Sequence, residues 1–208
     1  MKVRDVLVKV YEPGRLQAAW QQVRKNAGAA GIDQMTVEEF AQREEPLLAL
    51  IHDKLKSGSY RFQPARRALI PKEGTSKMRK LGIPVVMDRI AGASMHGVLE
   101  EIFDPDFTAS NFGFRSGRSQ HQAIRHVQRL VKEGRDWAVT IDLKSFFDEI
   151  PHGLILKLIR CKVADEQLVT LLARLLKAGV MVNGGRLKRR AKAVRKAHRS
   201  PRCSPTSS

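Results

Sequence analysis

The stretch TIDLKSFFDEIPH, residues 140–152, contains the side chains best suited to chemistry. A β-type run leads into Asp142, and Asp148 and Glu149 follow closely. Carboxylates at the end of a strand are groups that hold Mg²⁺ against substrate phosphates. The plainer alternative is that Asp142 caps a turn and Asp148 lies at the surface. A two-metal site needs a further carboxylate from another strand, and no convincing one follows residue 149.

A first basic loop precedes this stretch. Lys72 directly precedes the loop EGTSKMRK, and Lys77, Arg79 and Lys80 lie within it. Lysine as a point charge and arginine as a bidentate fork can converge on a phosphate. From these residues alone, a solvated charged loop is the preferred interpretation.

A second basic loop, GFRSGRS, places Arg115 and Arg118 beside two glycines and ahead of a helix. Backbone N–H groups and guanidinium groups in such a loop suit phosphate contacts. A tight turn whose arginines point into water is an equally good interpretation of this loop.

The chain is strongly basic, with a net charge of +17 over 208 residues, which predicts a polyanionic partner. The charge is uneven. Residues 186–202 hold nine of the 38 Lys and Arg and no acid, so the other 29 bases exceed the 21 acids by only 8. Much of the excess therefore lies in one low-complexity tail.

Several classes of protein are excluded by the composition. No apolar run approaches the roughly 18 residues that span a bilayer, and the N-terminus is too charged for a secretory signal. Cys161 and Cys203 have no metal-ligand spacing and form no disulfide framework. We therefore expect a protein of a reducing cytoplasm with no membrane partner.

The spacing of hydrophobic residues and the positions of capping and turn residues predict the helices and strands that must position these loops. Thr36 and Glu39 form a capping box for a long helix that Pro46 kinks, and Ser119 caps another. Helices are expected over residues 16–25, 36–58, 87–103, 120–133, 152–160 and 165–179, and strands over 60–72, 81–86, 137–141 and from 180. This order predicts an α+β fold.

Four segments in order resemble the N-terminal half of group II intron-encoded reverse transcriptases of the maturase type. They are NAGAAGIDQMTVEEF, YRFQPARRALIPKEGTSKMRKLGIPVVMDRI, LEEIFDPDFTASNFGFRSGRSQHQAI and TIDLKSFFDEIPH. The resemblance runs from about residue 5 to residue 184. Lys80, Glu101 and Ser116 stand where the family usually has proline.

The resemblance implies roles for the candidate residues. Asp142 would be a catalytic Mg²⁺ ligand, and Phe147 would lie under the incoming sugar and exclude a 2′-hydroxyl. Lys72 and Arg79 would hold the triphosphate. The remaining basic side chains would contact the nucleic acid: Arg115, Arg118, Lys77 and Lys80.

The resemblance also implies partners, namely group II intron RNA, an RNA template with a DNA primer, and dNTP, in the cytoplasm of a bacterium. The fold would be the fingers and an incomplete palm of a right-hand polymerase, followed by a disordered basic C-terminal tail. The expected segments are an N-terminal helical extension with the first reverse-transcriptase segment (1–58), fingers (59–135), the start of the palm (136–185) and the tail (186–208).

The chain departs from the family pattern after Gly185, where the family continues with PQG.PLSPLLANI and then with a hairpin that bears a (Y/F)ADD motif. We shifted the reading frame of residues 187–208 so that each new codon begins at the third base of the written one. The possible codons in this frame can encode EG.PQG.PLSPLLANII. We therefore expect a frameshift near Gly185 followed by an early stop, and a tail that was not selected for binding.

The sequence thus predicts a fragment of an RNA-directed DNA polymerase that is inactive as written. A non-catalytic RNA-binding module is the alternative. A short RNA chaperone driven by its basic tail is a third interpretation, and retron-type or diversity-generating reverse transcriptases are near neighbours of the resembled family.

Overall fold

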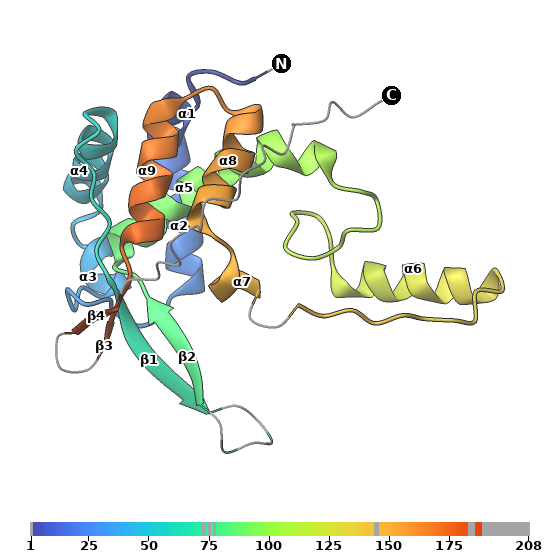
Figure 1. Cartoon of the computed structure of the whole chain (residues 1–208). Helices are drawn as coiled ribbons and strands as arrows, with labels where there is room; N and C mark the ends of the chain where they lie inside the picture. The colour runs from blue at the N-terminus through green and yellow to red at the C-terminus, as the bar shows by residue number, and fades with distance from the viewer. Residues whose placement is uncertain are drawn as a thin grey trace.

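The computed structural model describes residues 2–71, 74, 76, 78–143, 146–182 and 186–188, without the side chains of residues 147, 148 and 186–188. Figure 1 shows a group of packed helices, a long β-hairpin that projects from it, and a separate helix, α6, that extends to one side. In this part of the chain, no helix combines the length and apolarity needed to cross a membrane.

The N-terminal part is helical. Its elements are α1 (Val6–Tyr11), α2 (Pro13–Asn26), α3 (Val37–Ala41) and α4 (Glu44–Lys56). The capping box of Thr36 and Glu39 is confirmed at the start of α3. The single kinked helix was wrong, because the chain breaks between α3 and α4, before Pro46. Pro46 instead occupies the first turn of α4, where its missing N–H costs no hydrogen bond.

One hydrophobic core joins these helices to α5 (Val86–Phe103) and α9 (Glu166–Lys177). The rings of Trp20 and Phe40 lie 4.5 Å apart at its centre. Its largest fully buried members include Trp20, Phe40, Leu16, Ile51, Leu55, Ile90, Met95 and Leu168. The core therefore includes residues from all three predicted segments that precede the tail, 1–58, 59–135 and 136–185.

A mixed sheet, of order β2-β1-β3-β4, lies below the helices in the view of Figure 1. Its strands are β1 (Ala65–Pro71), β2 (Met78–Ile83), β3 (Val180–Val182) and β4 (Arg186–Lys188). The predicted hairpin is confirmed as the antiparallel pair β1–β2, and β3 joins β1 in parallel. Residues 186–188 correct the boundary of the predicted tail, because they pair with β3 as β4. The rest of the tail, 189–208, lies outside the described residues.

The strand predicted over residues 137–141 was wrong. This segment has no regular secondary structure, and Trp137, Val139 and Ile141 are 96%, 87% and 82% exposed. A strand is stable only when its backbone groups pair with a neighbour, and no described strand lies beside this run. The β-type composition alone could not supply that neighbour.

The last helices, α7 (Phe146–Glu149), α8 (His152–Lys162) and α9, lead back to the N-terminus. Asp165 caps two helices at once. One carboxylate oxygen accepts from the N–H groups of Gln167 and Leu168 in α9, and the other accepts from Leu7 N–H in α1 at 2.7 Å. Asp165 therefore ties the start of α1 to the start of α9.

Candidate nucleic-acid interface

The projecting hairpin carries two of the predicted cations on opposite faces. Arg79 lies opposite Ile70 and Lys80 lies opposite Leu69 in the β1–β2 ladder, and both basic residues are exposed. Successive side chains of a strand point to opposite sides, so Arg79 and Lys80 cannot bind the same phosphate from one face. Lys72 and Lys77 lie outside the described residues.

The base of the hairpin is anchored to the glycine-rich loop before α3. Arg66 donates from Nε and Nη2 to the carbonyl oxygen of Ala30, at 2.9 and 2.8 Å. Arg89 donates to the carbonyl oxygens of Ala27, Ala29 and Pro84. Sequence reasoning assigned no role to these two arginines, because their partners in the loop lie 36 to 62 residues away along the chain. They fix the direction in which the hairpin projects.

A buried carboxyl group supports the same region. Asp88 accepts hydrogen bonds from the Tyr60 hydroxyl at 2.9 Å and from Gln63 N–H at 2.8 Å. Burial raises the pKa of Asp88 to about 6, although hydrogen bonds from Gln63 and Tyr60 act in the opposite direction. Burial likewise raises the pKa of Tyr60. Asp88 thus joins α5 to the segment that enters β1.

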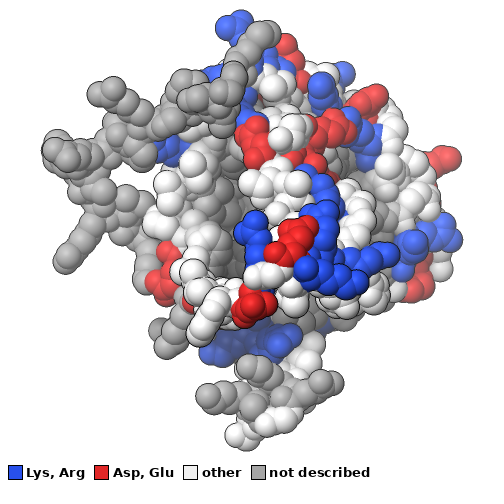
Figure 2. All heavy atoms as spheres, turned by 90° about the vertical axis from the view of Figure 1, so that its right-hand side faces the viewer, with Lys and Arg blue, Asp and Glu red and all other residues white. Residues whose placement is uncertain are grey.

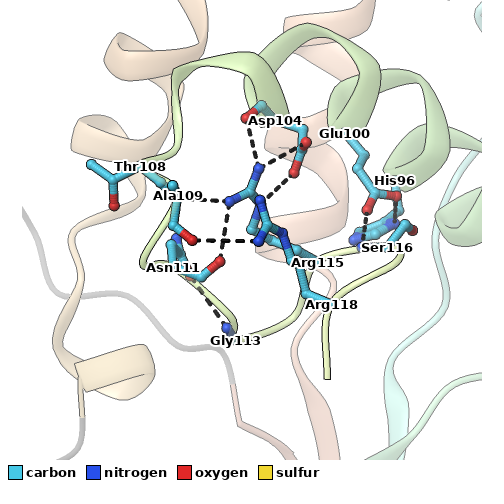
Figure 3. Close-up of polar contacts among 10 residues, drawn as sticks. All are labelled: His96, Glu100, Asp104, Thr108, Ala109, Asn111, Gly113, Arg115, Ser116 and Arg118. Carbon is cyan, nitrogen blue, oxygen red and sulfur yellow. Dashed lines mark hydrogen bonds and ion pairs between the residues drawn. The ribbon is translucent and has the colours of Figure 1, made fainter. Parts of the chain in front are cut away.

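Arg115 is held by protein groups on several sides (Figure 3). Its Nε and Nη2 atoms donate to the carboxylate of Asp104 at 2.6 and 3.0 Å, and Nη1 donates to the carbonyl oxygens of Thr108 and Asn111. The guanidinium also lies over the ring of Phe107, and the side chain is only 8% exposed. Hydrogen bonding to Asp104 raises the pKa of Arg115 and lowers the pKa of Asp104. Arg115 therefore shapes the loop.

The two departures from the usual prolines in this region both make polar contacts. Ser116 donates its N–H to Glu100 Oε1 at 2.9 Å, a bond that proline cannot make, and hydrogen bonds from Ser116 lower the pKa of Glu100. Glu101 accepts from both terminal nitrogens of Arg15, at 2.8 and 3.0 Å. These contacts fasten the loop to α5 and α5 to α2.

Arg118 differs from Arg115 because its side chain is exposed. Its guanidinium lies 5.6 Å from the ring centroid of Phe112, and Nη1 makes a long 3.4 Å hydrogen bond to the carbonyl oxygen of Ala109. Ser119, one residue on, caps α6 (Gln120–Lys132) as its sequence predicts, and Gln122 completes a capping box. The loop thus presents Arg118 while Arg115 holds its shape.

The predicted metal ligand Asp142 is exposed, in the unpaired segment that follows α6. In the described part of the chain, no group of three or more His, Cys, Asp and Glu side chains could hold a metal ion. The oxygens of Asp142 suit Mg²⁺, but one carboxylate does not complete a two-metal site. The backbone of Phe147 lies in α7, and its side chain, like that of Asp148, is not described.

The charge on this side of the molecule is mixed. Figure 2, which faces the side from which α6 extends, shows Lys and Arg side chains interleaved with Asp and Glu rather than one continuous basic surface. Binding of a polyanion by the described residues would therefore depend on particular arginines more than on a uniform field.

Comparison with known proteins adds the family context. Residues 70–196 match the family described as "Reverse transcriptase (RNA-dependent DNA polymerase)". The matched range continues past Gly185, where the motifs of the chain depart from the pattern described above.

Individual relatives extend the match toward the N-terminus. The chain is 35% identical to "Protein YkfC" of Escherichia coli K12, over 86% of this chain and 48% of that protein. It is also 35% identical to "Group II intron-encoded protein LtrA" of Lactococcus lactis subsp. cremoris, over 87% of this chain and 31% of that protein. An "Uncharacterized 91 kDa protein in cob intron" of Schizosaccharomyces pombe is 37% identical over 63% of this chain and 16% of its own length. The chain thus spans half or less of these relatives.

Proposed function

Because the chain belongs to the reverse transcriptase (RNA-dependent DNA polymerase) family, we propose that it forms the RNA-binding fingers and the start of the palm of a group II intron-encoded reverse transcriptase. The proposed ligand is group II intron RNA, and the complete polymerase would also take an RNA template, a DNA primer and dNTP. The fragment itself binds RNA and does not catalyse nucleotidyl transfer.

The observation that carries this proposal is the contrast between the two halves of the candidate site. The loop of Arg115 and Arg118 is fully built and fastened to α5, whereas Asp142 lies exposed without a described strand beside it. Positioned arginines can contact phosphate oxygens without a metal ion. Nucleotidyl transfer needs two metal ions held by several carboxylates.

The proposed residue roles follow the family. Asp142 would bind Mg²⁺, which would stabilise the charge that develops during transfer, and Phe147 would exclude a ribose 2′-hydroxyl. Lys72 and Arg79 would hold the triphosphate. Lys77, Lys80 and Arg118 would contact template and primer. Arg115 would act indirectly, by positioning the loop.

The test of RNA binding uses the full chain and a transcript of a group II intron, with an unrelated transcript of equal length as control. We expect a gel-shift preference for the intron that Asp142→Ala leaves unchanged and that the pair Arg79→Gln and Lys80→Gln weakens. Deletion of residues 1–56 is a poor test, since these residues supply much of the core, including Trp20 and Phe40. Equal binding of both transcripts would contradict the proposal.

The test of catalysis is primer extension on poly(rA)/oligo(dT) with Mg²⁺. We expect no incorporation by the purified chain. Incorporation that disappears in Asp142→Ala would show that the fragment assembles a working metal site, and the inactivity proposed here would then be wrong.

The change of reading frame near Gly185 is a separate proposal. It rests on the out-of-frame match of residues 187–208 to the family segment PQG.PLSPLLANI. The nucleotide sequence around and after codon 185 tests it. Restoring the frame should yield a continuation with a YADD-like motif, and unrelated downstream sequence would refute it.

A further inference from the structure

One face of α6 and the loop before it form a groove of about 370 Å³ that is lined by three arginines. Arg118 comes from the loop, and Arg125 and Arg129 come from the helix; Phe112 and His126 lie between them. Resting on the proposed RNA-binding function, we propose that this groove is a binding site for single-stranded RNA, separate from the hairpin. It would take backbone phosphates on Arg125 and Arg129 and one base against Arg118.

The helical spacing places these charges together. Arg125 and Arg129 are four residues apart, so they lie on the same side of α6, separated by about 6 Å along its axis. The apolar residues Ile124, Val127 and Val131 occupy the opposite side. A partner that covered the apolar side would leave the arginine side open to a ligand.

The charge of the groove is of one sign. Residues 120–132 contain no Asp or Glu, and the residues that line the groove include no acid. Glu133 approaches Arg129 at 3.7 Å, but both side chains are more than half exposed and such pairs are weak in water. Phosphate oxygens can therefore compete for Arg129.

The aromatic centre of the groove favours a nucleic acid over a simple anion. Arg118 lies 5.6 Å from the centroid of Phe112, and the His126 ring lies 5.6 Å from Phe112 on centroids. Arg129 donates to Nδ1 of His126 at 2.9 Å, so the proton of the neutral ring lies on Nε2, near the Ser110 hydroxyl. An arginine plane backed by an aromatic ring is a surface on which unstacked RNA bases stack.

The position of the groove makes it independent of the hairpin. In Figure 1, α6 extends to one side of the helical core, whereas β1 and β2 project below it. The groove was not found from the sequence, because Phe112 and Arg118 meet Arg125 and Arg129 only when the loop folds back on α6.

The experiment measures the anisotropy of a fluorescein-labelled oligouridylate with the full chain at several KCl concentrations. The variant is Arg125→Gln with Arg129→Gln, and the matched control is Lys157→Gln with Lys177→Gln, which removes the same charge from exposed lysines of α8 and α9. We expect a loss of affinity of tenfold or more, on the order of one charged hydrogen bond, in the arginine variant and a much smaller loss in the control. The slope of log affinity against log salt should fall by about 1.4, for two contacts at about 0.7 each.

A second variant tests the stacked arginine. Arg118→Lys keeps the charge but not the planar guanidinium, so it should weaken oligouridylate binding several-fold and leave binding of inorganic polyphosphate unchanged. Equal losses for both ligands would show that the groove binds phosphate alone, and the base contact would be overturned.

The remaining outcomes separate the two proposals. If the wild-type chain binds no RNA, the proposed function fails together with the groove. If it binds RNA and the arginine variant binds equally well, only the groove is overturned. Vesicles that contain anionic lipid should not bind the chain. If they do bind, if Val127→Ser abolishes this binding and if RNA does not displace it, α6 would be assigned to a membrane surface instead.

Discussion

The guanidinium of Arg115 is bound edge-on by the carboxylate of Asp104, with donor–acceptor distances of 2.6 and 3.0 Å. Two nitrogens facing two oxygens are the geometry in which an arginine binds a phosphate. Asp104 therefore occupies the position that a phosphate would take, and the direct contact with nucleic acid falls to Arg118.

The ion pair between Arg115 and Asp104 predicts that removing the negative charge of Asp104 weakens RNA binding. Asp104→Asn makes the chain more basic, so charge alone would strengthen RNA binding. Because the loop would lose its anchor, we expect weaker binding and faster chymotryptic cleavage after Phe112 and Phe114. Arg118→Gln is the matched comparison and should lower affinity without changing the cleavage rate. Tighter RNA binding by Asp104→Asn would contradict the positioning role of Arg115.

Gly31 is expected to be intolerant of a side chain. An added Cβ would lie 2.6 Å from Val85 Cα and 2.7 Å from Val85 N, and the backbone cannot move aside as a flexible side chain can. Gly31→Ala should cost at least about 1–3 kcal/mol in the free energy of unfolding. Urea denaturation measures this cost.

The matched control for that substitution is Gly97→Ala in the interior of α5. Nothing lies within 4 Å of a Cβ built at Gly97, so alanine should stabilise the helix by up to about 1 kcal/mol. The two Gly→Ala changes are thus expected to shift stability in opposite directions, and shifts of the same sign would contradict the close approach at Val85.

Asp165 is expected to stabilise two helices. Each helix cap contributes about 1 kcal/mol, so Asp165→Ala should cost about 2 kcal/mol in thermal or urea unfolding. Asp165→Asn keeps one oxygen for Gln167 and Leu168 but turns an amide group toward Leu7 N–H. Its loss in the free energy of unfolding should be roughly half that of Asp165→Ala. Equal losses for both variants would argue against the division between the two carboxylate oxygens.

The raised pKa of Asp88 predicts that its contribution to the free energy of unfolding falls as the pH rises. Its pKa in the folded chain, about 6, lies above the ordinary value of 3.8, so the folded state holds the proton more tightly than the unfolded state does. The stabilisation is complete below about pH 3.8 and is lost as the pH rises through about 6, with a total of about 3 kcal/mol.

The measurement is the difference in unfolding free energy between wild type and Asp88→Asn across this range. That difference should shrink with rising pH and become constant above about pH 7. Since the two proteins differ only at residue 88, contributions from all other groups cancel in the difference. A difference that grows with pH would show that the hydrogen bonds from Tyr60 and Gln63 outweigh burial.

Much of the local structure follows from neighbouring residues. The capping box at Thr36, the helix cap at Ser119 and the hairpin around Gly74 form as predicted, because each depends on groups a few residues apart. The motif order also identified the family, and the comparisons confirm it.

Contacts between distant segments could not be predicted in this way. The strand expected before Asp142 failed because a strand needs a partner, and composition does not name one. In α9, Leu168, Leu171 and Leu172 are buried, whereas Leu175, which follows at the same helical spacing, is exposed.

The sequence by itself determined most of the helices, the hairpin, the family and the residue types that can bind a phosphate. The tertiary structure decided which of those residues are exposed and can therefore reach a phosphate. Arg115 and Arg118 stand three residues apart in one motif, yet Asp104 binds the first and leaves the second exposed. Side-chain partners depend on which segments fold against each other, and that information lies in the packing of the whole chain rather than in any motif.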